Sequence, residues 1–455
     1  MALKSRRNLR SINNLSPFKL IALFYLFAVT ISSILLALPV AHQPGVELSF
    51  IDILFTAVSA VSVTGLSVIT VADTFSTTGI IMLAFVLQLG GIGVMSIGTA
   101  IWMLLGKKIG LKERRLIMTD QNQTSFQGVV RLIRQIFLVV LLIEFIGFLT
   151  LGTYFLQYYP PKEAYLQGFF GSISAMTNGG FDITGASLIP FADDYFVQFI
   201  NMLLIVAGAI GFPVLIEVKE YLFNNSKGLD AKKFSLFAKL TSFTFLMLVI
   251  VGMAFIILFE MNHFFSDKNW HEILFYALFQ SVTTRSGGLS TMDVSLLTEQ
   301  TKLFLSSLMF IGASPSSVGG GIRTTTFALL VIFMLTYARG QTRVRVFRRE
   351  IHDEDLIKAV VVTIMAVIIC FAAVVALTIT EPFSLGDILF EVTSAFGTVG
   401  LSTGITPGLS TFAKFVLMML MFIGRIGILT FLFTLKQEKK KTGNYHYPKE
   451  RIIIG

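Results

Sequence analysis

A short motif returns four times along this chain. It reads SAVSVTGL at residues 59–66, SAMTNGGF at 174–181, SAFGTVGL at 394–401 and, in a more divergent form, QSVTTRSGGL at 280–289. Every copy contains a glycine followed by Leu or Phe, and successive glycines lie 115, 108 and 112 residues apart. Such a near-constant period predicts four copies of one structural unit.

A second landmark supports the same period. A box of small residues follows each motif glycine by 24 to 28 residues, reading GGIG at 90–93, GAIG at 208–211, GASP at 312–315 and GRIG at 424–427. The third unit matches least closely, because Glu272–Phe275, which resembles Asp52–Phe55, lies three residues further from its glycine. The sequence therefore leaves the register of the third unit open.

The composition places the chain in a membrane. Of its 455 residues, 54% are hydrophobic and only 14% are charged, against roughly 25% in a soluble domain. The mean hydropathy is +0.77. These values exclude a soluble enzyme, a disordered chain and a disulfide-stapled secreted module. The single cysteine, Cys370, excludes an internal disulfide, the five histidines are scattered, and no constellation of residues indicates an enzyme.

Twelve apolar segments define the predicted architecture. Eight are long enough to span a membrane, at residues 18–40, 75–106, 130–158, 191–223, 234–260, 298–338, 356–380 and 406–435. Four are too short to span and are typical of re-entrant pore helices, at 50–62, 164–177, 272–285 and 385–397. The predicted fold is an all-α polytopic membrane protein. Four units of helix, pore helix, filter loop and helix surround a central pore in a pseudo-fourfold arrangement.

The unit boundaries follow from these segments and from the polar stretches between them. They give a cytoplasmic amino terminus at 1–17, pore unit 1 at 18–106, a cytoplasmic link at 107–129, pore unit 2 at 130–223, pore unit 3 at 224–338, a second link at 339–355, pore unit 4 at 356–437 and a carboxyl tail at 438–455. The tail ends in the apolar run Ile452–Gly455, which is either a frayed end or part of a dimer interface.

The basic residues predict the orientation. Of the 36 Lys and Arg residues, 29 lie at the termini, in the links between units or at the adjoining helix ends. Positive charge is retained in the cytoplasm, so both termini are predicted inside and the four short helices enter from outside. The net charge of +9 therefore does not indicate a nucleic-acid partner.

The repeated loop suits a dehydrated monovalent cation. A pore helix that points inward directs the negative end of its dipole toward the membrane centre. The loop is rich in Gly, Thr, Ser and Val without a carboxylate, so backbone carbonyls are the predicted ligands, oriented by a glycine with positive φ. A divalent ion would want carboxylates. The predicted K⁺ filter consists of Val63, Thr64, Gly65, Leu66, Asn178, Gly179, Gly180, Phe181, Ser286, Gly287, Gly288, Leu289, Thr398, Val399, Gly400 and Leu401.

These four quartets resemble the filter segments of the Ktr/Trk/HKT superfamily of cation transporters, and the resemblance covers nearly the whole chain. Gly65 matches the K⁺-conducting pattern rather than the Ser of Na⁺-selective plant members. Only 17 residues precede the first span, which is similar to the bacterial Ktr type. The resemblance implies K⁺ uptake across a bacterial plasma membrane. The alternatives are a Na⁺-conducting or Na⁺-coupled transporter of this superfamily and a carrier of organic solutes, which the shared orientation of the units argues against.

The resemblance also implies partners. It implies a membrane homodimer with one pore per subunit, surrounded by lipid, and a cytosolic ring of nucleotide-binding RCK-type subunits. The chain has no phosphate-binding loop of the form GxxxxGK[ST], so a nucleotide is expected only on that partner. No covalently bound cofactor is expected, and K⁺, or Na⁺ in the alternative, is the substrate.

A gate is predicted in the third unit. As one helix, residues 298–338 would be roughly 60 Å long, twice the hydrocarbon thickness, so the helix must break. The break is predicted at 312–321, where Gly and Pro do not hold a helix. It is either a passive hinge or a loop that blocks the pore beneath the filter, and the resemblance supports the loop. The predicted gate residues are Gly312, Ala313, Ser314, Pro315, Ser316, Ser317, Gly319, Gly320, Gly321 and Arg425.

Charged residues at membrane depth complete the predicted site. Arg425 either packs against helix carbonyls or forms an electrostatic barrier or an anchor for the gating loop, because a lone arginine there costs about 3 kcal/mol. Arg285 is predicted to support the filter from behind. The acids that begin the short helices are interpreted as first-turn residues favoured by the helix dipole, namely Asp52, Glu163, Glu272 and Asp387.

Overall fold

The computed structural model describes residues 16–93, 128–223 and 234–435, together with Gly110, Arg114, Met118 and Glu450. This part of the chain is almost entirely helical, and its strands form one two-stranded hairpin. Residues 1–15 of the predicted amino terminus, most of the link at 107–129 and all of the predicted tail except Glu450 lie outside the described residues.

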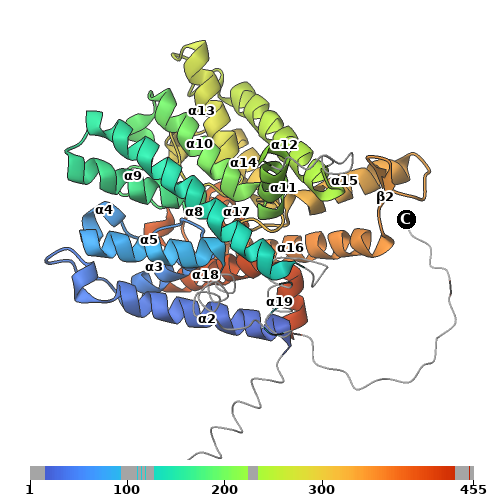
Figure 1. Ribbon diagram of the computed structural model, residues 1–455, viewed down its shortest axis with the longest axis horizontal. Helices are drawn as coiled ribbons and strands as arrows, with labels where there is room; N and C mark the ends of the chain where they lie inside the picture. Colours follow the sequence, from blue (N-terminus) through green and yellow to red (C-terminus); the bar gives the residue numbers. More distant parts are fainter. Residues whose placement is uncertain are drawn as a thin grey trace, which may run out of the picture.

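Each predicted unit begins with a long helix, continues with a short one and returns through a further helix (Figure 1). The first contains α2 (Pro17–Leu36), α3 (Phe50–Ser62), the single turn α4 (Val71–Thr74) and α5 (Thr77–Ile92). The second contains α8 (Val129–Tyr154), α9 (Pro161–Met176), α10 (Tyr195–Ala209) and α11 (Phe212–Phe223). The third contains α12 (Leu236–Glu260), α13 (Trp270–Thr283), α14 (Glu299–Ile311) and α15 (Thr324–Ala338). The fourth contains α16 (Asp353–Thr380), α17 (Leu385–Gly397), α18 (Thr411–Ile426) and α19 (Ile428–Leu435).

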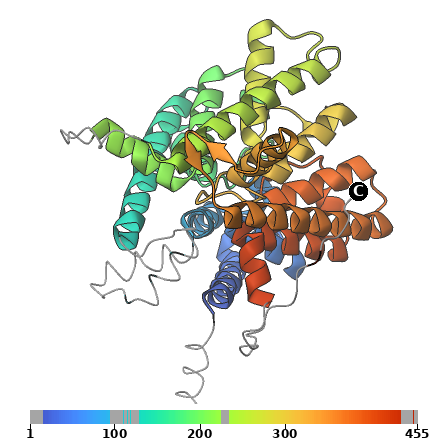
Figure 2. The same cartoon turned by 90° about the vertical axis from the view of Figure 1, so that its right-hand side faces the viewer.

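The hairpin of β1 (Arg345–Val346) and β2 (Arg349–Glu350) joins the third unit to the fourth. Figure 2 shows the four segments following one another around the molecule, from blue at the bottom through teal and green to yellow at the top and orange-red at the right. Segments that are distant in the sequence therefore meet at the centre.

The first helix of each unit is long and apolar enough to cross a membrane. These helices are α2, α8, α12 and α16, and their most apolar windows have mean hydropathies between 2.1 and 3.1. The predicted spans at 191–223 and 406–435 are each sharply bent, because α10 and α11 meet at 108° and α18 and α19 at 101°. The chain turns at Gly211 and Gly427, which have φ values of 102° and 83°. Glycine at positive φ ends a helix readily because it has no Cβ.

The other small-residue boxes also mark helix ends. Gly93 follows the last residue of α5 with a φ of 91°, and Gly312 follows α14 with a φ of 71°. The interruption predicted at 312–321 is therefore present between α14 and α15. The small-residue boxes therefore mark the ends of α5, α10, α14 and α18, the helices that follow the loops.

The short helices form the interior of the molecule. Each carries a phenylalanine with no exposed surface near its middle, namely Phe55, Phe170, Phe279 and Phe390, and α17 carries a second one, Phe396, at its end. The buried ring lies ten residues before the motif glycine in three units and nine residues before it in the third. Phe275, which the sequence comparison matched to Phe55, instead stacks on Tyr195 at 4.5 Å. The third short helix thus reaches its loop one residue earlier than the others.

Candidate functional site

The four motif glycines lie against one another at the centre of the molecule. A Cβ atom added to Gly65 would lie 2.8 Å from Cα of Gly180, and one added to Gly288 would lie 2.6 Å from the same atom. A Cβ added to Gly400 would lie 3.0 Å from Cα of Gly65. These separations are shorter than real Cβ contacts, so the four loops converge at a place that admits backbone only.

The loops share one backbone pattern. The motif glycines have φ values of 93°, 67°, 74° and 96° in chain order. The residue two positions earlier also has positive φ in every loop, at Val63, Asn178, Ser286 and Thr398. The left-handed conformation costs a residue other than glycine about 1–2 kcal/mol, so the surrounding structure must impose it. The pattern fixes the register that the sequence left open: Ser286 and Gly288 correspond to Val63 and Gly65.

One hydroxyl in each unit ties the loop to its short helix. Ser59 Oγ accepts a hydrogen bond from the backbone N–H of Gly65 at 3.1 Å, and Ser394 Oγ accepts one from Gly400 at the same distance. Ser174 Oγ donates to the carbonyl after its glycine at 2.6 Å, and Thr283 Oγ1 does so at 2.5 Å. These hydroxyls belong to the repeated motif, and their recurrence at matching positions is the sequence signal for this role.

Buried polar side chains of two short helices hold the outer parts of the loops. Glu391 accepts hydrogen bonds from Thr406 Oγ1 at 2.9 Å, from the backbone N–H of Thr403 at 3.2 Å and from Ser402. In the third unit, Gln280 Oε1 accepts from Ser290 Oγ at 3.2 Å. The sequence did not predict a role for Glu391 or Gln280, because nothing in an apolar helix identifies which polar side chain faces a loop.

Each predicted filter quartet lies at this meeting point. The fourth residue of each quartet has its side chain buried in the hydrophobic core, so only its backbone faces the place where the loops meet. These residues are Leu66, Phe181, Leu289 and Leu401. On one side of the four glycines lies a cavity of about 440 Å³, which Asp182 and Asp293 also line. Acidic side chains at the mouth of a cavity raise the local concentration of cations.

Polar contacts join neighbouring units around the short helices. Lys414 of α18 pairs with Asp52 of α3 at 2.8 Å, and Lys302 of α14 lies 3.7 Å from Asp387 of α17. Both lysine side chains are nearly buried, with 12% and 10% of their surface exposed. In the same way, Tyr195 Oη of α10 lies 2.6 Å from His271 Nδ1 of α13.

The four acids do lie in the first turns of the short helices, as expected. Glu272 also accepts from both the side chain and the backbone N–H of Asn269, which lowers the pKa of Glu272. Asp52 and Asp387 have a second function that the sequence did not indicate, because their lysine partners belong to another unit. In the described part of the chain no three His, Cys, Asp or Glu side chains gather as a metal site.

The small residues of the boxes are explained by close approach to the loops. A Cβ on Gly90 would lie 2.5 Å from the carbonyl oxygen of Val61, and one on Gly424 would lie 3.0 Å from the carbonyl carbon of Phe396. The second helices of units one and four therefore touch the ends of their own short helices. A larger residue would push helix and loop apart.

The segment between α14 and α15 lies on the other side of the filter-like loops from the acidic cavity. A Cβ on Gly319 would lie 2.5 Å from Cβ of Ser286, and one on Gly320 would lie 2.7 Å from Oγ1 of Thr398. The backbone N–H groups of Ser314 and Val318 donate to carbonyls at the end of α10, at 3.0 and 3.2 Å. The predicted gate residues of this segment are thus packed directly beneath two of the loops.

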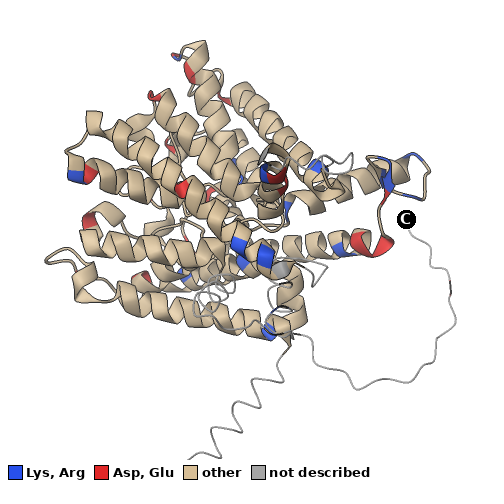
Figure 3. Cartoon of the chain, in the orientation of Figure 1, with Lys and Arg blue, Asp and Glu red and all other residues tan. Residues whose placement is uncertain are grey.

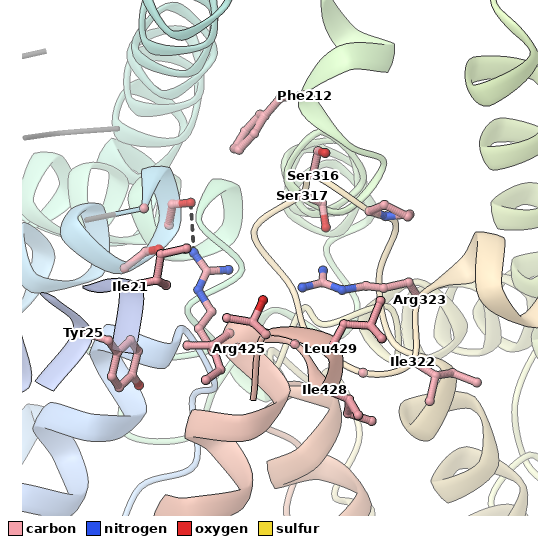
Figure 4. A pocket seen from close by; sticks show the side chains of 18 of the residues that line it. Ile21, Tyr25, Phe212, Ser316, Ser317, Ile322, Arg323, Arg425, Ile428 and Leu429 are labelled. Carbon is pink, nitrogen blue, oxygen red and sulfur yellow. Dashed lines mark hydrogen bonds between the residues drawn. The ribbon is translucent and has the colours of Figure 1, made fainter. Parts of the chain in front are cut away.

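Two arginines hold this segment (Figure 4). Arg425 donates to the carbonyl of Val318 in the segment, and it also donates to the carbonyls of Gly90 and Gly91 at the end of α5. Arg323 donates to Ser314 O at 3.3 Å and to the carbonyl of Gly319. Both guanidinium groups line a cavity of about 250 Å³. Arg425 therefore bonds both to helix carbonyls of α5 and to a carbonyl of the segment 312–321. The contacts thus fit two of the predicted roles together, packing against helix carbonyls and anchoring the segment.

Arg285 is fully buried behind the third loop. Its Nη2 donates to the carbonyl of Leu308 in α14 at 2.6 Å. Its Nε and Nη1 have no hydrogen-bond partner within the described residues. This hydrogen bond links the loop of the third unit to α14, the helix that precedes the segment 312–321. The position of Arg285 agrees with the prediction that it supports the loop from behind.

The chain resembles known transporters along nearly its whole length. The family model for TrkH, a cation transport protein, matches residues 19–444. The chain is 61% identical to "Ktr system potassium uptake protein D" of Bacillus subtilis, over 98% of each chain, and 32% identical to "Potassium/sodium uptake protein NtpJ" of Enterococcus hirae, over 97% of this chain and 98% of that one. Its fold matches the crystal structure of the potassium transporter TrkH from Vibrio parahaemolyticus with a TM-score of 0.72 at 20% identity, covering 93% of this chain and 86% of that one.

Proposed function

Because the chain belongs to the TrkH family of cation transport proteins, we propose that it takes up K⁺ across a membrane through a filter built from its four motif loops. One observation carries this proposal: the four glycines contact one another with positive φ. Such a site offers no side-chain ligands, and a ring of carbonyls is a known way to replace the hydration shell of K⁺.

The filter proposal assigns a role to each quartet. Backbone carbonyls of Val63–Gly65, Asn178–Gly180, Ser286–Gly288 and Thr398–Gly400 bind the ion, while Leu or Phe at the fourth position anchors the loop in the core. The four units then surround the pore with pseudo-fourfold symmetry. The cavity beside Asp182 and Asp293 is the outer entrance, and the excess of basic residues on the opposite side supports cytoplasmic termini in a plasma membrane.

The segment 312–321 is the proposed gate. It lies beneath the loops of units three and four, so ions cannot pass until it moves. Its hydrogen bonds to α10, together with those from Arg323 and Arg425, favour the blocked state. A segment whose conformation is held by a few polar contacts is suited to control by a partner.

The proposed assembly is a homodimer controlled by a separate cytosolic subunit. The relative's name includes the word "system", and the sequence has no phosphate-binding loop of its own, so a regulatory nucleotide would act on a second protein. A second candidate function is Na⁺ transport or Na⁺-coupled K⁺ transport. This candidate is supported by the name of the Enterococcus hirae relative, "Potassium/sodium uptake protein NtpJ", which includes sodium.

Uptake of K⁺ and Na⁺ by a bacterial strain that lacks its own potassium systems tests the proposal. Wild-type protein should restore growth at low K⁺. Gly65→Ser should lose K⁺ preference, because a Cβ there would lie 2.7 Å from the carbonyl oxygen of Gly179. Gly45→Ser is the matched control, since Gly45 has a φ of 85° and open space around it. An unchanged ion preference in Gly65→Ser, with normal amounts of protein in the membrane, would contradict the filter assignment.

A further inference from the structure

The hairpin of β1 and β2 is a compact, well-defined element outside the proposed pore. Its strands pair Arg345 with Glu350 and Val346 with Arg349. The two turn residues, Phe347 and Arg348, have φ values of 46° and 64°. Left-handed conformations at both positions are characteristic of a type I′ turn, which matches the twist of the strands. The hairpin therefore holds its side chains in fixed directions.

The two faces of the hairpin differ in chemistry. Val344 and Val346 are buried and pack with Leu240 of α12, Ala328 of α15 and Leu356 of α16. Side chains alternate between faces along a strand. Four arginines are exposed: Arg343 and Arg345 alternate with the valines along the first strand, Arg348 lies in the turn, and Arg349 is paired with Val346 across the hairpin. Figure 3 shows the resulting blue hairpin at the end of the molecule, next to the red start of α16.

Most of this positive charge is not neutralised. In the described part of the chain, the hairpin arginines form ion pairs with Glu350 alone, at 3.8 Å from Arg343 and 3.9 Å from Arg345. All three of these side chains are at least half exposed, so these pairs are weak. Of the three acids in the first turn of α16, Asp355 pairs with Lys358 at 3.0 Å, while Asp353 and Glu354 form no ion pair with a described residue and do not pair with the arginines.

The turn of the hairpin lies at the entry of a membrane span. The ring of Phe347 contacts the ring of Phe243 edge to face, with centroids 6.5 Å apart. Phe243 is 58% exposed, and Leu246 and Ile250 continue the same exposed apolar side of α12. Phe243 lies seven residues after the start of α12, or roughly 10 Å along its axis. Lys239, one turn earlier, is exposed as well.

We propose that this hairpin, with Lys239, binds the headgroups of anionic phospholipids. A guanidinium group can donate two hydrogen bonds to the oxygens of one phosphate, and phenylalanine rings on interfacial elements are buried at the boundary between headgroups and acyl chains. The hairpin presents four guanidiniums around an exposed phenylalanine that touches the lipid-facing side of a span. A soluble protein partner would match the charge equally well, but it would not explain why the turn is seated against the exposed apolar surface of α12.

The test measures lipid binding to the full-length protein purified in a neutral detergent. Phosphatidylglycerol should bind more tightly than phosphatidylcholine. Arg345→Gln/Arg349→Gln should weaken phosphatidylglycerol binding, by about fivefold for each arginine removed. Glu350→Gln should strengthen it, because the acid that opposes the site is gone. Lys358→Gln removes an exposed basic residue nearby that is already paired, and it should change nothing.

The opposite outcomes overturn the proposal. Equal binding of the two lipids, or unchanged phosphatidylglycerol binding in both hairpin variants, would exclude an anionic-lipid site. Displacement of the lipid by millimolar inorganic phosphate would show that the hairpin binds free phosphate instead. Loss of binding to the cytosolic regulatory subunit with lipid binding intact would assign the hairpin to a protein interface. Because Glu350→Gln is expected to gain affinity, poor folding cannot imitate the predicted result.

Discussion

Replacing Arg425 with Ala should open the pore. Arg425 donates to Val318 in the segment 312–321 and to Gly90 and Gly91 at the end of α5. When the segment leaves the pore, the bond to Val318 must break, whereas Gly90 and Gly91 belong to α5 and lie outside the segment. A hydrogen bond from a charged group contributes about 1.5–3 kcal/mol. Its loss should therefore raise the open fraction by about 10- to 150-fold.

The assay is K⁺ flux into liposomes that contain the purified protein without its cytosolic partner. Arg425→Ala should increase the initial rate, and Arg425→Lys should give an intermediate rate because one donor group remains. Deletion of residues 314–319 should increase flux as well. In that deletion background, Arg425→Ala should add nothing, since its acceptor in the segment has been removed.

Two results would refute this reasoning. Unchanged or lower flux in folded Arg425→Ala protein would show that the arginine does not favour a blocked state. Full additivity of Arg425→Ala and the deletion would show that the arginine acts elsewhere, for example on the ions themselves. A thermal-unfolding measurement in the same detergent establishes that each variant is folded.

Other predictions concern the contacts around the filter. Lys414→Met should lower stability by about 2 kcal/mol, between the values for exposed and buried pairs, because it leaves Asp52 unpaired. Thermal unfolding should show this loss, whereas the exposed Lys358→Met should be nearly neutral, and equal effects would contradict a special role for the pair. Ser394→Ala removes the acceptor for the N–H of Gly400 and should cost about 1 kcal/mol. It should also reduce the K⁺ over Na⁺ preference in flux assays, and an unchanged preference would mean that the hydroxyl does not position the loop.

Local sequence is enough to predict much of this architecture. Hydropathy identified the long first helices and the short helices, because burial in lipid demands continuous apolar segments. The period of the motif located all four loops, and the run GASPSSVGGG located the interruption after α14. Each of these features depends on residues that are neighbours along the chain.

Local sequence gave the wrong alignment of the third short helix, because two segments of similar composition take different positions in their units. The run Glu272–Phe275 resembles Asp52–Phe55, yet Phe279 rather than Phe275 takes the fully buried place in the third short helix. The backbone conformations of Ser286 and Gly288 settle that register. The segments 191–223 and 406–435 read as straight spans because their hydropathy is continuous, although a single glycine in each sets a bend.

Other features arise only when the chain closes on itself. Lys414 and Asp52 are 362 residues apart, and Arg425 and Val318 are 107 apart, so no spacing in the sequence could have paired them. Their contacts exist because the last unit packs against the first and beneath the loop of the third. The hydrophobic pattern thus specified which segments form long and short apolar helices. The packing of the four units against one another determined which charges are paired, which backbone meets at the motif glycines and which segment lies against it.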